Sequence, residues 1–350
     1  MSRVFLLCVY LLMFGCTSKQ PYEIEAVCEV SEIYNYVVKW DTYPLMEGDV
    51  KIFTSLDPDH FNKDQPYKVA PISAGKADLM IKGSLRRRYF LLQFDEDHEI
   101  VVGVKSQGFK TIHNYRDFGG LKTENGRKIK WGKLYRSGNL DNVSDISARR
   151  IAYMGVKTWV DLRKGGMTEK INSQMNIETY HNIPMSTNVD PDLVRARLMN
   201  GSMTKLDAVK EVQYILETML TCTESLKKIF MVLEDPNSYP VIISCDYGLI
   251  QTSVFSTLLL HILEVPDYTI IDEYELNNQY FDMNNFARKY YRLSPRQQDV
   301  LTALVISDRK YINNMIENIS VRYGSLDNYI SKEIGLTKED IQKIRTNLLQ

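Results

Sequence analysis

The pattern of hydrophobic residues changes near residue 105, and this change constrains the fold more than any other feature of the sequence. Residues 22–105 hold six short segments that are β-branched or aromatic, separated by turn-rich stretches such as DPDHFNKDQPY (57–67). Beyond residue 106, strand-like segments alternate with segments whose apolar residues recur every three or four positions. The length of 350 residues also favours two domains. The sequence therefore predicts an all-β domain followed by an α/β domain.

The first domain is predicted to be a small antiparallel β-sandwich over residues 22–105. Six or seven short strands in about 85 residues suit this architecture, and Trp40 on an early strand is expected in its core. The architecture resembles immunoglobulin or fibronectin type III modules, which implies a spacer or docking role. The basic run LRRRY (85–89) lies between strand segments and is expected to form a solvated face.

The second domain, residues 106–350, is predicted to hold a mainly parallel sheet flanked by helices. The expected strands are 134–138, 156–163, 177–184 and 240–244. The expected helices are 144–155, 205–220, 225–234 and 253–264, and the remainder of the chain is expected to be largely helical. Ser144 is a candidate cap for the first of these helices. Strands that alternate with helices are typical of a parallel sheet.

Composition excludes several classes of function. Lys and Arg total 43 against 44 Asp and Glu, so no basic surplus favours a nucleic-acid partner. Hydrophobic residues at 44% and charged residues at 25% exclude wholesale disorder. Five cysteines without CxxC spacing are too few for a disulfide scaffold and indicate no zinc site. We expect no nucleic-acid partner, no metal and no cofactor.

The N-terminus has the composition of a targeting segment. Arg3 precedes an apolar run, VFLLCVYLLMFG (4–15), which has signal-peptide length and is too short to span a bilayer. Gly15 followed by Cys16 and polar residues resembles a bacterial lipoprotein signal. This resemblance implies removal of residues 1–15, diacylation of Cys16 and a linker over 16–21. The protein would then be lipid-anchored in the cell envelope, at the outer membrane or the periplasmic face. The alternative is an ordinary secretory signal with an incidental cysteine.

The candidate chemistry centres on Cys245. A buried strand, PVIIS (240–244), leads directly into CDYGLIQT (245–252), and a helix follows. A loop between a strand and a helix N-terminus presents backbone N–H groups and the positive end of the helix dipole, which favour anions and activate a thiol. A cysteine at the end of a buried strand is also commonly an inert apolar residue. These residues alone leave both interpretations open.

Three ordered motifs in the second domain resemble the bacterial tyrosine/serine protein phosphatase family, which is related to dual-specificity and phosphoinositide phosphatases. The motifs are NYRDFGG (114–120), GKLYRS (132–137) and DLR (161–163). The C-terminal run, residues 323–349, is similar to the terminal helices of the family, so the resemblance covers residues 106–350. It implies an α/β phosphatase fold in which Cys245 is the nucleophile and forms a thiophosphate intermediate.

The loop departs from the pattern of that family, H-C-x-A-G-K-D-R-T. Here it is SCDYGLIQT (244–252), so the histidine, lysine, aspartate and arginine of the pattern are replaced. The candidate phosphate-loop residues are Asp246, Tyr247, Gly248, Leu249, Ile250 and Gln251. An arginine that makes two charge-assisted bonds to a phosphoryl group contributes about 3–6 kcal/mol, or about 10²–10⁴ in rate. Gln251 can return one neutral hydrogen bond at best, which predicts impaired catalysis.

The resemblance also assigns roles outside the loop core. Thr252 would stabilise the leaving thiolate. Asp161 matches a position proposed as the acid, and its alternative role is a strand-end carboxylate that caps or pairs. Arg116, Asp117 and Arg163 match supporting residues that hold the loop and the opening segment, although either arginine could in principle swing into the site.

Three functions follow from this sequence. The first is a degenerate phosphatase that binds a phosphorylated protein or a small anionic ligand, or docks a partner, at the envelope. The second is an active cysteine phosphatase that hydrolyses phosphotyrosine, phosphoserine or phosphoinositide monoesters. The third is a purely structural envelope lipoprotein in which Cys245 is a buried thiol.

Overall fold

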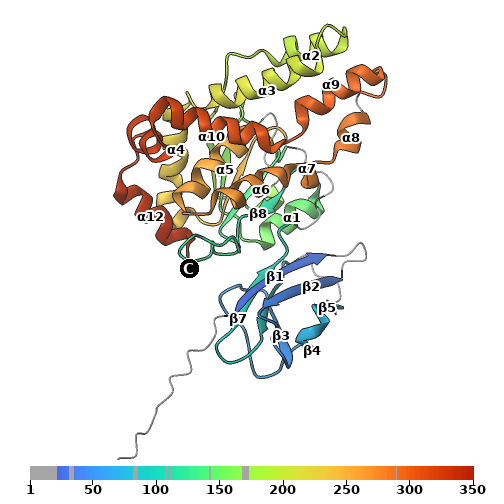
Figure 1. Cartoon of the computed structure of the whole chain (residues 1–350), viewed down its shortest axis with the longest axis vertical. Coiled ribbons are helices and arrows are strands. Elements are labelled where there is room, and N and C mark those ends of the chain that lie inside the picture. The colour runs from blue at the N-terminus through green and yellow to red at the C-terminus, as the bar shows by residue number, and fades with distance from the viewer. Residues whose placement is uncertain are drawn as a thin grey trace, which may run out of the picture.

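The computed structural model describes residues 22–30, 35–81, 86–106, 109, 112–141, 143–167, 173–288 and 290–350. The predicted signal peptide, Cys16 and the linker lie outside these described residues. The chain forms two bodies, with the strands from the N-terminal part below and a larger body of helices and sheet above (Figure 1). Within the described residues, no helix is both long enough and apolar enough to cross a membrane.

The N-terminal body consists of two antiparallel sheets. One has the order β1-β2-β5 and the other β4-β3-β6-β7. The strands are β1 (Glu23–Val30), β2 (Tyr36–Tyr43), β3 (Asp49–Ser55), β4 (Lys68–Pro71), β5 (Lys76–Leu79), β6 (Tyr89–Gln93) and β7 (Glu99–Gly103). Six of these correspond to the predicted segments. The sequence did not predict β4, which has four residues and follows the turn-rich stretch directly.

One hydrophobic cluster fills the space between these sheets. Val38, Val50 and Phe90 are completely buried in it, because alternate residues of each strand face the same side. Trp40 is also buried, and its indole N–H donates to the carbonyl of Ile72 at 2.8 Å. The expected place of Trp40 in the core is confirmed. The likeness to immunoglobulin or fibronectin type III modules stays a prediction.

The C-terminal body has mixed α/β structure, as predicted, around a five-stranded sheet with the order β11-β10-β12-β9-β8. Its strands are β8 (Arg116–Asp117), β9 (Leu134–Ser137), β10 (Thr158–Asp161), β11 (Thr179–Asn182) and β12 (Val241–Ser244). Neighbouring strands are parallel except for the β8–β9 pair. Register places Asp161 and Ser137 opposite Ser244, so three strands reach the same edge at their carboxyl ends. Ligands of such sheets bind at this edge.

Helices cover both the sheet and this edge. They are α1 (Asp145–Tyr153), α2 (Pro191–Met199), α3 (Lys205–Met219), α4 (Thr223–Glu234), α5 (Gln251–Ile262), α6 (Asp267–Glu275), α7 (Asn277–Tyr280), α8 (Met283–Arg288), α9 (Pro295–Val305), α10 (Arg309–Tyr323), α11 (Leu326–Asn328), a π-helical turn η4 (Tyr329–Ile334) and α12 (Lys338–Leu348). The predicted helices match α1, α3, α4 and α5, and Ser144 caps α1 by accepting from the N–H of Ser147. Figure 1 shows α2, α3 and α9 side by side at the end of the molecule away from the sandwich.

The two bodies are joined through Arg87, and here the expectation of a solvated face is wrong. Arg87 is buried, forms a very short ion pair with Asp117 of β8, and donates to the carbonyl of Val104 at 2.6 Å. Its guanidinium also lies over the rings of Tyr89 and Trp131. The sequence pattern could not show this, because the partner Asp117 belongs to the other body.

Candidate active site

The cysteine loop, residues 245–252, leaves the sheet at its middle strand. β12 runs into Cys245, and α5 begins at Gln251, two residues earlier than the sequence predicted. The apolar strand is buried by neighbours on both sides, which fixes the point at which the loop starts. Ser244, which replaces the histidine of the family pattern, is completely buried and accepts a hydrogen bond from the indole N–H of Trp159 at 2.7 Å.

Hydrogen bonds from neighbouring segments to the carbonyl oxygens of the loop fix its backbone conformation. The carbonyl of Asp246 accepts from the N–H of Asn139 at 3.2 Å, and that of Tyr247 accepts from the side-chain amide of Asn114 at 3.1 Å. Gly248 has a φ of +69°, and a Cβ there would lie 2.8 Å from the Asn114 side chain. Glycine is therefore required for the tight turn of the loop.

The amide groups of the same loop remain free to bind a ligand. Among the described residues, no protein acceptor is bonded to the backbone N–H groups of residues 246–251. The N-terminus of α5, a helix of twelve residues, adds its dipole at the same place. Outward-held carbonyls and unpaired amides together form a concave site for an oxyanion.

The Cys245 thiol sits at the base of this loop. The residue is 1% exposed, and its sulfur lies 3.6 Å from the hydroxyl of Thr252. The structure thus brings together two of the three predicted catalytic residues. A hydroxyl at this position can donate to a thiolate.

Arg136, on β9, supports the loop from the side of the sheet. One of its terminal nitrogens, Nη2, donates to the carbonyl of Gly248 at 2.8 Å, to the hydroxyl of Thr252 at 3.2 Å and to the hydroxyl of Ser253 at 2.8 Å. Arg136 therefore holds a carbonyl of the loop together with two hydroxyl groups at the start of α5.

Among the described residues, no carboxylate is bonded directly to the guanidinium of Arg136. Burial and, after it, the nearby charge of Arg116 lower the pKa of Arg136 to about 9, although Glu273 and Cys245 act in the opposite direction. Its buried Nε also has no hydrogen-bond partner. A bound anion or a thiolate would relieve this uncompensated positive charge.

Asp161, the candidate acid, lies at the end of the neighbouring strand β10 and is completely buried. Its carboxylate accepts from Arg163 at 2.7 Å and from the Tyr180 hydroxyl at 3.0 Å. Arg163 also pairs with Asp141 at 2.7 Å. These bonds correspond to the pairing role that the sequence left open beside the acid role, which stays a prediction.

The other two supporting residues are tied into separate networks. Arg116 is completely buried, pairs with Glu273 at 2.6 Å and donates to the side chain of Asn277 at 2.8 Å. Asp117 accepts from Arg87 and from the backbone N–H of Gly132 at 2.8 Å. Both residues fix the opening segment of the domain, and Arg116 reaches the loop through Asn114, whose side-chain oxygen accepts from it at 3.0 Å.

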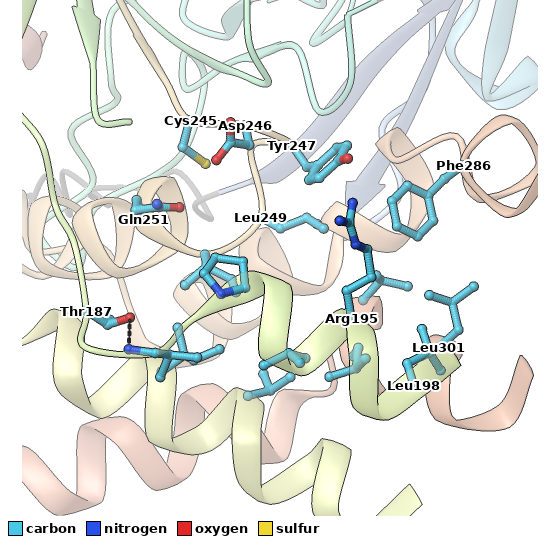
Figure 2. Close-up of a pocket in the computed structure, with 18 of the residues that line it drawn as sticks. Thr187, Arg195, Leu198, Cys245, Asp246, Tyr247, Leu249, Gln251, Phe286 and Leu301 are labelled. Carbon is cyan, nitrogen blue, oxygen red and sulfur yellow. Dashed lines mark hydrogen bonds between the residues drawn. The ribbon is translucent and has the colours of Figure 1, made fainter. Parts of the chain in front are cut away.

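The loop faces a cavity of about 340 Å³ (Figure 2). Cys245 and Gln251 lie at one end, and Asp246, Leu249 and Ile250 also line it. Its opposite wall is formed by side chains from α2, α3 and α9, including Arg195 of α2. Figure 2 shows the Arg195 side chain directed from α2 toward Leu249 and Phe286.

The sequence analysis did not predict that the side chains of Asn114 and Arg136 bind the loop. It also did not predict helix α2, which carries Arg195. Arg136 belongs to the motif GKLYRS (132–137). A charged residue inside a predicted buried strand was the signal that could have indicated its role in binding the loop. For α2, the signal was Asp190 followed by Pro191, since Asp190 accepts from the backbone N–H of Asp192 and proline suits a first helical turn.

Cys245 lies between a central parallel strand and a helix, with a hydroxyl beside its sulfur and unpaired amides in its loop. This arrangement is typical of cysteine-dependent phosphatases. The sequence profile described as "Tyrosine phosphatase family" matches residues 108–350. The chain belongs to the tyrosine phosphatase family, and the family predicted from the motifs is confirmed.

Individual relatives are similar at low identity. A curated protein of Cupriavidus necator, provisionally named a tyrosine-protein phosphatase, is 25% identical over 258 residues, which cover 71% of this chain and 90% of the relative. The core catalytic domain of the PP-IP phosphatase SIW14 from S. cerevisiae, in complex with citrate, is 14% identical with a TM-score of 0.28, covering 59% of this chain and 91% of that chain. A second structure of the Siw14 catalytic core is 12% identical with a TM-score of 0.29, covering 60% and 94%.

Proposed function

We propose that this protein is an exported, lipid-anchored member of the tyrosine phosphatase family whose C-terminal domain binds a phosphorylated protein or small anionic ligand. In this proposal the domain hydrolyses phosphate monoesters poorly or not at all. It would act as a binding module at the cell envelope.

One observation carries this proposal: the loop keeps the shape for an oxyanion, but its own residues, 245–252, include no cationic side chain. The backbone N–H groups of residues 246–251 have no protein acceptor among the described residues, which favours binding. Gln251 is neutral where the family pattern has arginine. Two charge-assisted bonds are worth about 3–6 kcal/mol, so their loss slows turnover by about 10²–10⁴.

Neither arginine considered for rescue is free to replace the missing one. Arg116 is bonded to Glu273, and Arg163 is bonded to Asp141 and Asp161. Moving either guanidinium into the loop would leave a buried carboxylate without its partner, which costs about 3–5 kcal/mol. Arg136 touches the loop, but from the side of its carbonyl groups.

A second candidate function is an active phosphatase, and Arg195 is the observation that favours it. Arg195 lines the same cavity as Cys245, and among the described residues the carboxylate paired with its exposed side chain is the exposed Asp192, at 3.1 Å. Such surface pairs contribute little and are easily exchanged. In this alternative the Cys245 sulfur attacks phosphorus, the bond to the ester oxygen breaks, an acid protonates that oxygen, and water then hydrolyses the thiophosphate. The third function, an inert structural thiol, is disfavoured by the cavity at Cys245.

Hydrolysis of p-nitrophenyl phosphate separates these functions. For the binding module, the native protein should show no turnover above the Cys245→Ser variant, and Gln251→Arg should raise it steeply. For the active enzyme, the native protein should already turn over, and both Cys245→Ser and Arg195→Gln should reduce the rate. For a structural protein, neither orthovanadate nor phosphate should bind to the native or the Gln251→Arg protein.

The export and anchoring parts of the proposal depend on residues 1–21 and on sequence alone. Metabolic labelling with a fatty acid should place the label on the native protein and not on a Cys16→Ser variant. The labelled protein should fractionate with the outer membrane or the periplasmic face. Label that persists in the variant would contradict lipidation at Cys16.

The proposal also gives the N-terminal sandwich a docking role beside the binding domain.

A further inference from the structure

The cavity above the cysteine loop is much more apolar than a site for a free phosphate group needs to be. Its walls include Val194 of α2, Ile215 of α3, Phe286 of α8, and Leu301 and Leu304 of α9. Its volume of about 340 Å³ is within the range of small-molecule sites. Such sites are mostly apolar and carry a few polar groups that orient the ligand.

Several polar groups of this cavity lie where it meets the loop, and Arg195 lies on the opposite wall. Among its described lining residues, the charged ones are Arg195 and Asp246. Cys245 and Gln251 lie at the same end, next to the unpaired amides of the loop. Asp246 belongs to the loop and Arg195 to the opposite wall, so the attraction of the loop end for an anion comes from its unpaired amides and the N-terminus of α5.

Two substitutions in the loop continue the apolar wall up to this polar end. Leu249 and Ile250 stand where the family pattern has lysine and aspartate, and both are half-buried and line the cavity. Leu249 also packs with the hydrophobic cluster that includes Phe286 and Leu301. A ligand whose oxyanion is held by the loop would therefore meet aliphatic surface immediately beyond its first atoms.

We propose that the site takes an alkyl oxyanion, a molecule with one anionic headgroup on an unbranched hydrocarbon chain. The loop amides hold the headgroup, and the chain lies along α2, α3 and α9. This inference rests on the proposed anion-binding function and adds the class of ligand. A phosphate and a carboxylate head share this chemistry, and the experiment distinguishes them.

Chain length is the property to vary. Each methylene that leaves water for an apolar wall adds about fourfold in affinity. If the chain enters the cavity, octyl phosphate should bind on the order of a hundredfold more tightly than butyl phosphate. Burial of the chain should also make the heat capacity change of binding more negative.

The experiment is isothermal titration of the mature chain with inorganic phosphate, butyl phosphate, octyl phosphate, octanoate and octanol, each with and without orthovanadate. We expect the order octyl phosphate, butyl phosphate, inorganic phosphate, with competition by orthovanadate. Octanoate that binds more tightly than octyl phosphate would assign a carboxylate head, and weaker binding would assign a phosphate head. Octanol should bind least well of the eight-carbon compounds.

A pair of neighbouring residues on α2 provides a matched control. Val194 lines the cavity, whereas Leu193 is exposed and lies outside its lining. Val194→Asn should reduce the affinity for octyl phosphate about tenfold and leave that for inorganic phosphate unchanged, while Leu193→Asn should change neither. If the Val194 variant fails to fold, Leu304→Asn on α9 tests independently whether the cavity wall contributes to the affinity for octyl phosphate.

The outcomes separate this inference from the proposed function. Equal affinities for butyl and octyl phosphate would overturn the inference while leaving anion binding intact. Failure of every phosphate to bind would overturn both. A gain with chain length that Val194→Asn and Leu304→Asn leave unchanged would place the chain outside this cavity and would also overturn the inference.

Discussion

Replacement of Arg87 by leucine tests how firmly the sandwich is fixed to the phosphatase domain. The side chains of Arg87 and Asp117 are 4% and 0% exposed, and the pair lies at the junction of the two bodies. Leucine keeps much of the apolar volume and removes the guanidinium. It leaves the Asp117 carboxylate buried without its charged partner.

The expected cost follows from the bonds that remain. Removal of one partner of a buried ion pair typically destabilises a protein by about 3–5 kcal/mol. Asp117 still accepts from the backbone N–H groups of Gly119 and Gly132, at 2.7 and 2.8 Å, so part of its charge stays compensated. The lower end of that range, about 3 kcal/mol, is therefore expected.

Urea unfolding, followed by far-ultraviolet circular dichroism, measures this cost. The native chain should unfold in one transition, and Arg87→Leu should move the transition to lower urea or divide it into two as the bodies uncouple. Asp117→Asn alone should also destabilise, and the double variant should lose less than the sum of the two single variants. Arg86→Leu, at an exposed neighbour, should cost less than about 1 kcal/mol.

A cost below about 1 kcal/mol for Arg87→Leu, with fully additive single and double variants, would refute this reasoning. The ion pair would then contribute no more than a surface pair. The two bodies would be held together by their other contacts, such as the bond from the Trp131 indole to the carbonyl of Val101 at 3.2 Å.

Two further predictions concern buried charges near the loop. Arg136→Met should slow alkylation of Cys245 by iodoacetamide, because Arg136 orients the Thr252 hydroxyl that lies 3.6 Å from the Cys245 sulfur, while half-exposed Cys222 reports unchanged exposure in the same molecule. Equal slowing of both cysteines would contradict the role of Arg136. Burial raises the pKa of Glu273, but the charges of Arg116, Lys105 and Arg136 and the hydrogen bond from Arg116 together outweigh burial and lower this pKa to about 2. The carboxylate therefore stabilises the fold fully above about pH 4.5, and this contribution is lost as pH falls toward 2. Urea unfolding between pH 5 and 2.5 should be less pH-dependent in Glu273→Gln, and equal slopes would contradict this.

The course of the chain was largely predictable because strands and helices differ in period. Segments such as 240–244 and 253–264 are long apolar runs that tertiary contacts do not override. The position of Cys245 between them followed directly. Helix α2 was missed because Leu198 is its one fully buried residue, which leaves little amphipathic pattern to detect.

The partners of charged residues were not predictable in the same way. Arg87 and Asp117 are 30 residues apart, and Arg116 and Glu273 are 157 apart. No local pattern joins residues at such separations, so a basic run between strands could not be distinguished from a solvated face. The motif resemblance implied supporting roles for Arg116 and Arg163, but it did not identify the carboxylates with which they pair.

The most direct test of the account compares the rate of phosphate ester hydrolysis by the unmodified protein with that of Gln251→Arg under identical conditions. We predict that the unmodified protein stays at the level of Cys245→Ser, and that restoring the guanidinium raises the rate by about 10²–10⁴. Rapid hydrolysis by the unmodified protein, abolished by Cys245→Ser, would contradict the account.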